Sequence, residues 1–187
     1  MKLCLYPTGW HAHLCQTVGA YRPWLLAQGS LTRRIVSRCA AFGVRGVQLQ
    51  NGWWESAEAG GKGGRQRALL REVCLYCGAT PLVYAHSVLP LASLRGAWQA
   101  LRRLGDRPLG EVLFSDPQVR RAPLHYKKLH PRHWLYRRAC RYLVAPPPFL
   151  WARRSVFTLN RRTIQVTEVF LPGILDLDAR DIALHIP

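Results

Sequence analysis

The chain has 187 residues, 49% of them hydrophobic, and its 27 Lys and Arg against 10 Asp and Glu give a formal charge of +17. This composition excludes global disorder and fits one domain, residues 1–187, with a sizeable core. The charge favours anionic partners: nucleic acid, an acidic membrane surface or anionic metabolites. No apolar run reaches the roughly 20 residues of a membrane-spanning helix, and the first residues lack the apolar stretch of a secretory signal. We therefore expect a cytoplasmic protein.

In the first part of the chain, apolar residues recur at helical spacing up to residue 39, and a strand-like pattern follows from residue 44. Residues 24–39 are amphipathic, with an interruption at Gly29–Ser30 where Ser30 can cap a second helix. Residues 44–50 are consistent with a strand. Residues 51–67 include the glycine-rich run 60–64 and predict a loop.

The middle of the chain predicts a hairpin followed by a helix. Residues 68–76 and 82–89 have strand composition and are separated by a short segment with turn chemistry. Residues 93–104 have apolar positions at helical spacing, and Gly105 is a suitable terminator. Residues 112–114 form a short apolar segment.

The last part of the chain contains a basic stretch and a second hairpin. Residues 120–143 are basic and aromatic-rich, and their conformation is not evident from the pattern. Residues 151–159 and 163–171 predict two strands joined around 160–162. Strands joined by short turns, with helices before and between them, predict an α+β fold with a single antiparallel sheet flanked by helices.

Glu168 is a charged residue on an otherwise apolar strand face. Side chains alternate between the two faces of an extended strand, so Glu168 shares its face with Ile164, Val166 and Phe170. A carboxylate in these surroundings needs a partner, because burial penalises its ionised form. The other face is expected to be solvated, since it carries Thr163, Gln165 and Thr167.

Arg71 is the cationic counterpart of Glu168, because alternation places it on one face with Leu69, Val73 and Leu75. Two interpretations remain open. The two residues could form a buried ion pair with a structural role. Alternatively they could line a pocket in which Arg71 binds a substrate carboxylate through two parallel hydrogen bonds and Glu168 accepts a hydrogen bond or a proton.

The cysteines show no dense disulfide framework, and we predict that most are buried thiols; they stand at positions 4, 15, 39, 74, 77 and 140. The pair Cys74-x-x-Cys77 has no second pair at zinc-site spacing, so a structural role is favoured over a metal or redox role. Residues 125–138 mix basic and aromatic side chains, which suits either a nucleic-acid surface or a solvated basic loop.

Several segments, taken in chain order, resemble the chorismate pyruvate-lyase family; they are 24–34, 70–73, 87–94, 104–114, 151–155 and 167–172. The resemblance spans residues 24–172. It implies an antiparallel sheet flanked by helices, with the ligand pocket enclosed beneath two flap segments. It further implies a monomeric lyase that converts chorismate to 4-hydroxybenzoate and pyruvate, the first committed step toward ubiquinone, with no metal, cofactor or nucleic acid.

The resemblance also implies roles for individual residues. Arg71 would bind the ring carboxylate and Glu168 would contact the 4-hydroxyl, while main-chain groups of Leu31 and Leu109 would touch the ligand. His86 stands where the family commonly has Arg, which predicts weaker or pH-dependent binding if that Arg holds the substrate. Residues 120–149 are longer and more basic than the corresponding family segment.

Two other functions fit the sequence. The first is a module that binds an aromatic acid without converting it, since ligand-sensing domains of some transcription regulators resemble this fold. The second is a nucleic-acid-binding protein that uses the basic residues 120–141, whose binding would weaken steeply with salt.

Overall fold

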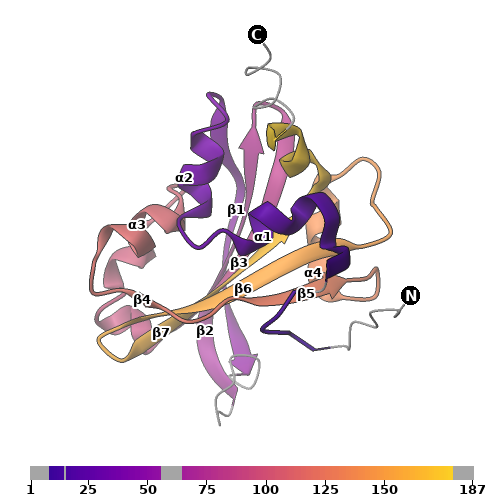
Figure 1. Cartoon of the computed structure of the whole chain (residues 1–187). Helices are drawn as coiled ribbons and strands as arrows, with labels where there is room; N and C mark the ends of the chain where they lie inside the picture. Colours follow the sequence, from indigo (N-terminus) through magenta and orange to yellow (C-terminus); the bar gives the residue numbers. More distant parts are fainter. Residues whose placement is uncertain (1–8, 15, 56–64, 179–187) are drawn as a thin grey trace.

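A computed structural model describes residues 9–14, 16–55 and 65–178. Seven antiparallel strands form one open sheet in the order β1-β2-β3-β7-β6-β4, and β5 also pairs with β6 (Figure 1). The strands are β1 (Phe42–Glu55), β2 (Arg65–Cys77), β3 (Thr80–Pro90), β4 (Arg120–Arg121), β5 (His125–Leu129), β6 (Leu150–Leu159) and β7 (Arg162–Phe170). The predicted α+β class with a single antiparallel sheet is therefore confirmed.

The helical segments are short. At the N-terminal end, η1 and α1 precede α2, and Ser30 caps α2 by accepting a hydrogen bond from the backbone N–H of Arg33 at 3.3 Å. The predicted break at Gly29–Ser30 is thus confirmed. The segments are η1 (Gln16–Tyr21), α1 (Arg22–Leu26), α2 (Leu31–Val36), η3 (Ser93–Arg95), η4 (Gln99–Arg103), α3 (Leu109–Ser115), α4 (Trp134–Ala139), η5 (Cys140–Tyr142) and η6 (Pro172–Leu175).

Both predicted hairpins form. β2 and β3 are joined by two residues, of which Gly78 has a φ of +57°. β6 and β7 are joined by Asn160 and Arg161, whose φ values of +47° and +61° place both in the left-handed region. Two successive left-handed residues match the twist of the flanking strands in a two-residue hairpin.

Two secondary-structure predictions were wrong. Residues 51–55 belong to β1 and residues 65–67 to β2, because the two strands pair over this range; the run 60–64 lies outside the described residues. Residues 93–104 form η3 and η4 rather than one helix. Ser93 and Trp98 donate side-chain hydrogen bonds to backbone carbonyls at the start of β7, which ties this segment to the hairpin.

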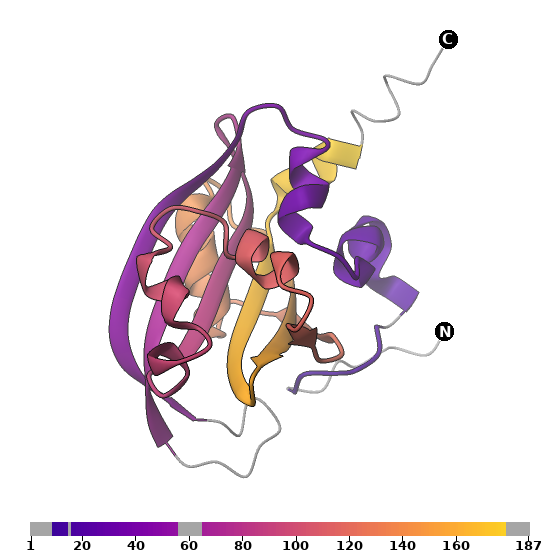
Figure 2. The ribbon, with the colours of Figure 1, turned by 90° about the vertical axis from the view of Figure 1, so that its left-hand side faces the viewer.

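Apolar side chains pack on both faces of the sheet. On one face, α1 and α2 pack over one end of the strands, while η3, η4 and α3 pack over the other end. On the opposite face, α4 packs against β3, β6 and β7 (Figure 2). Residues 120–143, whose conformation the pattern left open, contain β4, β5, α4 and η5, and the interpretation of residues 125–138 as a solvated loop is wrong.

The face of β7 that was expected to be solvated is buried from Gln165 onward. Gln165 and Thr167 are only 4% and 2% exposed, although Thr163 is exposed. The prediction failed because α4 covers this side of β7, and no pattern in residues 120–143 indicated that covering helix.

The cysteine prediction also needs correction. Cys39, which follows α2, forms a disulfide with Cys77 at the end of β2, with 5.9 Å between the two Cα atoms. Cys74 is a buried thiol and Cys140 a half-buried one, while Cys4 and Cys15 lie outside the described residues. Cys74 and Cys77 pack into different apolar clusters.

Candidate active site

A pocket lies on the face of the sheet that carries α1, α2 and α3, between the two apolar clusters of that face. Its empty space, counted together with its open mouth, is about 600 Å³. Its lining is mostly apolar with a few polar groups, as is typical of small-molecule sites. The polar groups here come from side chains that strand pairing aligns in two rows.

The first row crosses four neighbouring strands. Arg71 on β2 pairs with Ser87 on β3, which pairs with Val166 on β7, which pairs with Ser155 on β6. All four line the pocket. Ser155 is held by a 2.7 Å hydrogen bond from its Oγ to the carbonyl of Ala122.

The second row lies two residues along the strands. Val73, Ala85, Glu168 and Arg153 are successive partners on β2, β3, β7 and β6, and all four line the pocket. Because β2 and β7 are separated by β3, standard strand dimensions put the Cα atoms of Arg71 and Glu168 about 12 Å apart. The two side chains therefore enter the pocket at separate positions on its floor.

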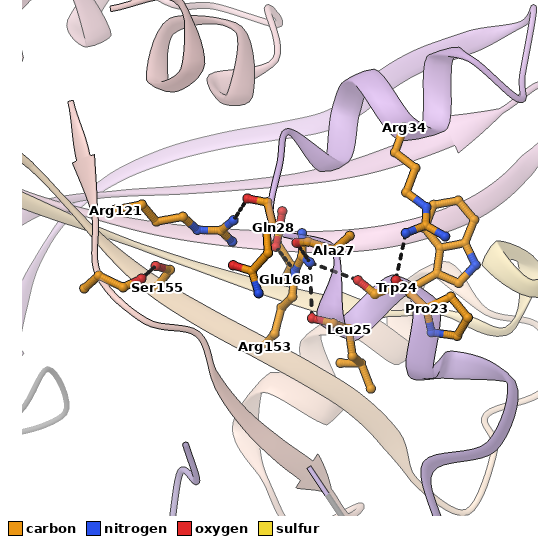
Figure 3. A network of polar contacts seen from close by, with 11 residues as sticks. Pro23, Trp24, Leu25, Ala27, Gln28, Arg34, Arg121, Arg153, Ser155 and Glu168 are labelled. Atoms are coloured by element: carbon orange, nitrogen blue, oxygen red, sulfur yellow. Dashed lines mark hydrogen bonds and ion pairs between the residues drawn. The ribbon is translucent and has the colours of Figure 1, made fainter. Parts of the chain in front are cut away.

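Arg153 is the partner of Glu168. Its Nε donates to Oε2 of Glu168 at 2.5 Å, and the Glu168 side chain is 18% exposed whereas that of Arg153 is 0% exposed. Nη1 of Arg153 also donates to the carbonyls of Trp24, Leu25 and Ala27 at 2.9, 3.3 and 2.7 Å (Figure 3). This arginine therefore fixes both the pocket carboxylate and the main chain at the end of α1.

Arg71 is 3% exposed and does not pair with Glu168. Its Nη2 donates to the carbonyls of Gly105 and Arg107 at 3.1 and 2.9 Å, which anchors the segment before α3. Its Nε is buried with no acceptor among the described residues. Burial lowers the pKa of Arg71, and the charge of Asp106 opposes this shift. Of the two interpretations left open by the sequence, the structural ion pair between Arg71 and Glu168 is therefore wrong.

Two segments cover the pocket, as the resemblance implied. One is the start of α2, including Leu31, and the other is the start of α3, including Leu109. They approach each other closely, because a Cβ atom added at Gly110 would lie 3.1 Å from Oγ1 of Thr32. Leu31 and Leu109 are both buried.

The structure thus brings all four predicted site residues, Leu31, Arg71, Leu109 and Glu168, to one pocket. Sequence reasoning missed Arg153 and Arg121. Arg153 had the same signal as Glu168, since alternation places it between Trp151 and Phe157 on an apolar face. Arg121 had no such signal, because β4 has only two residues.

His86 lies on the face opposite to the pocket. Its ring packs edge-on against Trp134 of α4, with 4.9 Å between the ring centroids. Burial lowers its pKa to about 4, and the charge of Arg138 adds to this effect. His86 is not among the residues that line the pocket, whereas its neighbours Ala85 and Ser87 are.

Within residues 9–14, 16–55 and 65–178, no group of three or more His, Cys, Asp or Glu side chains is placed to hold a metal ion. Across the same described part of the chain, none of the helices has the length and apolar character needed to cross a membrane.

The sequence matches a family model described as "Chorismate lyase" over residues 13–179. Two relatives are each named "Probable chorismate pyruvate-lyase". The protein from Nitrosospira multiformis is 47% identical over 171 residues, covering 90% of this chain and 95% of that protein. The protein from Nitrosomonas europaea is 45% identical over 170 residues, covering 90% and 96%.

Solved structures with a similar fold are more distant in sequence. The effector domain of PhnF from Mycobacterium smegmatis has a TM-score of 0.53 at 15% identity, covering 79% of this chain and 91% of that chain. The ligand-binding domain of a putative GntR-family transcriptional regulator from Bordetella bronchiseptica has a TM-score of 0.50 at 15% identity, covering 70% and 84%. At this identity the similarity concerns the fold alone.

Proposed function

The chain belongs to the chorismate lyase family, and we propose on that basis that this lyase converts chorismate to 4-hydroxybenzoate and pyruvate. The observation that carries the proposal is that Arg71 and Glu168 reach one covered pocket from strands separated by β3. A cation and a carboxylate at separate positions in one pocket suit a ring that has a carboxylate at one end and a hydroxyl at the other.

Arg71 binds the ring carboxylate in this proposal. Its guanidinium is already oriented by two main-chain carbonyls, and its buried Nε has no acceptor among the described residues. An arginine is always charged at neutral pH and can donate to a carboxylate without prior protonation. Binding the carboxylate would satisfy the buried N–H, whose desolvation is otherwise uncompensated.

Glu168 accepts a hydrogen bond from the ring hydroxyl. One of its oxygens, Oε2, is held by Arg153, so the carboxylate has a fixed orientation. A carboxylate has further lone pairs for a second donor. Holding the hydroxyl in this way orients the carbon that bears it, and with it the C–H bond that must break.

In this proposal the covering segments shield the bound substrate from water. Leu31 and Leu109 are the first residues of α2 and α3, where main-chain N–H groups have no acceptor within the helix. We assign the main-chain ligand contacts to these two residues. A covered site strengthens each polar interaction with the substrate, because the local dielectric is low.

The reaction needs two bonds to break. The ether C–O bond breaks, and its electron pair leaves with the enolpyruvate oxygen. The C–H bond at the hydroxyl-bearing carbon also breaks, and its electrons complete the aromatic ring while the proton is passed on to become part of pyruvate. Aromatisation supplies the driving force, so the protein contributes orientation and charge stabilisation. No metal or organic cofactor takes part in this scheme.

We further propose that 4-hydroxybenzoate made here enters ubiquinone synthesis and that the protein works in the cytoplasm as a monomer. Its partners in this scheme are small molecules, chorismate and 4-hydroxybenzoate, and not nucleic acid.

One assay tests the proposed reaction. The purified protein is incubated with chorismate, and pyruvate and 4-hydroxybenzoate are both quantified. The proposal requires equal amounts of the two products. Saturable binding of 4-hydroxybenzoate without turnover would instead indicate an acid-binding module. If neither occurs and the protein binds RNA or DNA with steep salt dependence, the basic charge serves nucleic-acid binding.

A further inference from the structure

The proposed roles leave one cation of the pocket without a function. Three arginines line the pocket, Arg71, Arg121 and Arg153, and Glu168 is the acidic residue among the described lining residues. The lining thus has a formal excess of two positive charges. Chorismate has two carboxylates, one on the ring and one on the enolpyruvyl group, and only the first has been assigned a partner.

The three arginines differ in how far the protein already uses them. Arg153 donates four hydrogen bonds, to Glu168 and to three carbonyls, and Arg71 donates two. Arg121 donates one, from Nη1 to the carbonyl of Gln28 at 2.6 Å (Figure 3). Its Nε is buried and has no acceptor among the described residues, as is also true of Nε of Arg71 and Nη2 of Arg153. A buried N–H in this state is costly unless a ligand accepts from it.

Packing fixes Arg121 on the pocket face. It pairs with Phe157 of β6 across the sheet, so its side chain lies on the same face as Phe157, Ser155 and Arg153. Its guanidinium carbon lies 5.7 Å from the ring centroid of Phe114 and 5.4 Å from that of Phe157. Two aromatic faces stabilise a cation at this position and restrict its orientation.

The position of Arg121 in the sheet matches the geometry of the substrate. β2 with Arg71 and β4 with Arg121 are separated by β3, β7 and β6, so the two guanidinium groups enter the pocket from opposite sides. Glu168 on β7 lies between them. Burial lowers the pKa of Arg121, and the negative charge of Glu168 opposes this shift. On chorismate, the enolpyruvyl ether is attached next to the hydroxyl-bearing carbon and away from the ring carboxylate.

We infer that Arg121 binds the enolpyruvyl carboxylate of the substrate and remains bound to it while the ether bond breaks. The inference rests on the proposed function. In this position Arg121 distinguishes substrate from product, because 4-hydroxybenzoate has lost the enolpyruvyl carboxylate. It also stabilises the negative charge that develops on the departing enolpyruvate.

The test compares substrate turnover with product binding in matched variants. Arg121→Gln removes the charge, and Arg120→Gln is the control, because Arg120 is the neighbouring residue on β4 but is exposed. Arg121→Gln should lower kcat/KM for chorismate by about 10- to 100-fold, the loss typical of a hydrogen bond to a charged group. Its Kd for 4-hydroxybenzoate should stay within about threefold of wild type, because the product lacks the carboxylate that Arg121 binds. Arg120→Gln should change neither quantity.

Arg121→Lys is the second variant, for the case in which Arg121→Gln does not fold. Lysine keeps the positive charge but lacks the planar set of N–H donors of arginine. Arg121→Lys should also lower kcat/KM for chorismate, by less than Arg121→Gln does, and leave the Kd for 4-hydroxybenzoate unchanged. The inference is overturned if both Arg121 variants turn over chorismate like wild type, or if they weaken 4-hydroxybenzoate binding as much as turnover. These outcomes differ from failure of the proposed function, in which the wild-type protein itself releases no 4-hydroxybenzoate.

Discussion

Arg153 and Glu168 lie directly opposite each other on β6 and β7, and their side chains form a 2.5 Å ion pair on the pocket face. The same guanidinium binds three main-chain carbonyls at the end of α1. A single buried residue, Arg153, therefore holds both the Glu168 carboxylate and the main chain that leads into α2. A change at Arg153 acts on both.

We expect Arg153→Met to lower the free energy of unfolding by about 3 kcal/mol, because it leaves the Glu168 carboxylate without its partner in a largely buried site. Urea denaturation measures the change. Arg162→Met is the control, since Arg162 is exposed on the same hairpin and should shift stability by less than about 0.5 kcal/mol. Equal midpoints for the two variants would show that the ion pair has no structural role.

The disulfide between Cys39 and Cys77 links the end of α2 to the end of β2 across a sequence separation of 38 residues. Closing a loop of this length is expected to stabilise the fold by up to about 4 kcal/mol through the unfolded state. A reducing agent should therefore lower the urea midpoint of the wild-type protein. The double variant Cys39→Ala/Cys77→Ala should have a lower urea midpoint before reduction, and the reducing agent should change that midpoint less. An equal decrease of the midpoint in both proteins would contradict the disulfide.

His86 makes stability depend on pH. Its pKa is lowered to about 4 in the fold against 6.5 in the unfolded chain, so between these values the unfolded state binds more protons and stability rises with pH. Acidification from pH 7 to pH 5 should then cost about 2 kcal/mol through this residue. Half-buried His133 has a similarly lowered pKa of about 4 and remains in both proteins compared below.

The measurement compares urea unfolding of wild type and His86→Gln at pH 7 and pH 5. The variant should lose less stability on acidification, because the group that gains a proton on unfolding is absent. Parallel losses in the two proteins would mean that His86 is not held in its neutral form by the fold.

Gly173 in η6 approaches the sheet too closely for a side chain. A Cβ atom there would lie 2.8 Å from the backbone oxygen of Pro81, and a backbone atom cannot move aside cheaply. Gly173→Ala should lower stability by about 1–3 kcal/mol, the usual cost of overpacking. Gly43→Ala is the control, since, chain neighbours apart, no atom of the described residues lies within 4 Å of that added Cβ. Thermal unfolding distinguishes them, and similar melting temperatures would contradict the close approach.

Strand alternation was sufficient to select Arg71 and Glu168, because both lie in strands long enough to show which residues share a face of the sheet. It failed to identify the partner of Glu168, since the pairing with Arg153 depends on the register of the β6–β7 hairpin, and the predicted turn 160–162 is one residue longer than the observed turn. Arg121 could not be found in this way, as β4 has two residues and acquires its orientation only by pairing with β6.

Other features depended on contacts distant in sequence. The disulfide forms because α2 ends beside the end of β2, and nothing in the spacing of Cys39 and Cys77 indicated that proximity. The burial of Gln165 and Thr167 depends on the opposite face of the sheet being covered, and the sequence indicated no helix at residues 134–139. Local patterns predicted most strands and the turn between β6 and β7, because those signals lie within a few residues.

The most direct test of the roles of Arg71 and Glu168 is the rate of pyruvate release from chorismate by wild type, Arg71→Lys and Glu168→Gln, with Arg95→Gln as an exposed control. Circular dichroism should confirm that all four are folded. We predict that wild type and Arg95→Gln release pyruvate and 4-hydroxybenzoate in equal amounts, and that the two site variants are slower by about 100-fold or more. Wild-type rates from folded Arg71→Lys and Glu168→Gln would contradict the proposed site.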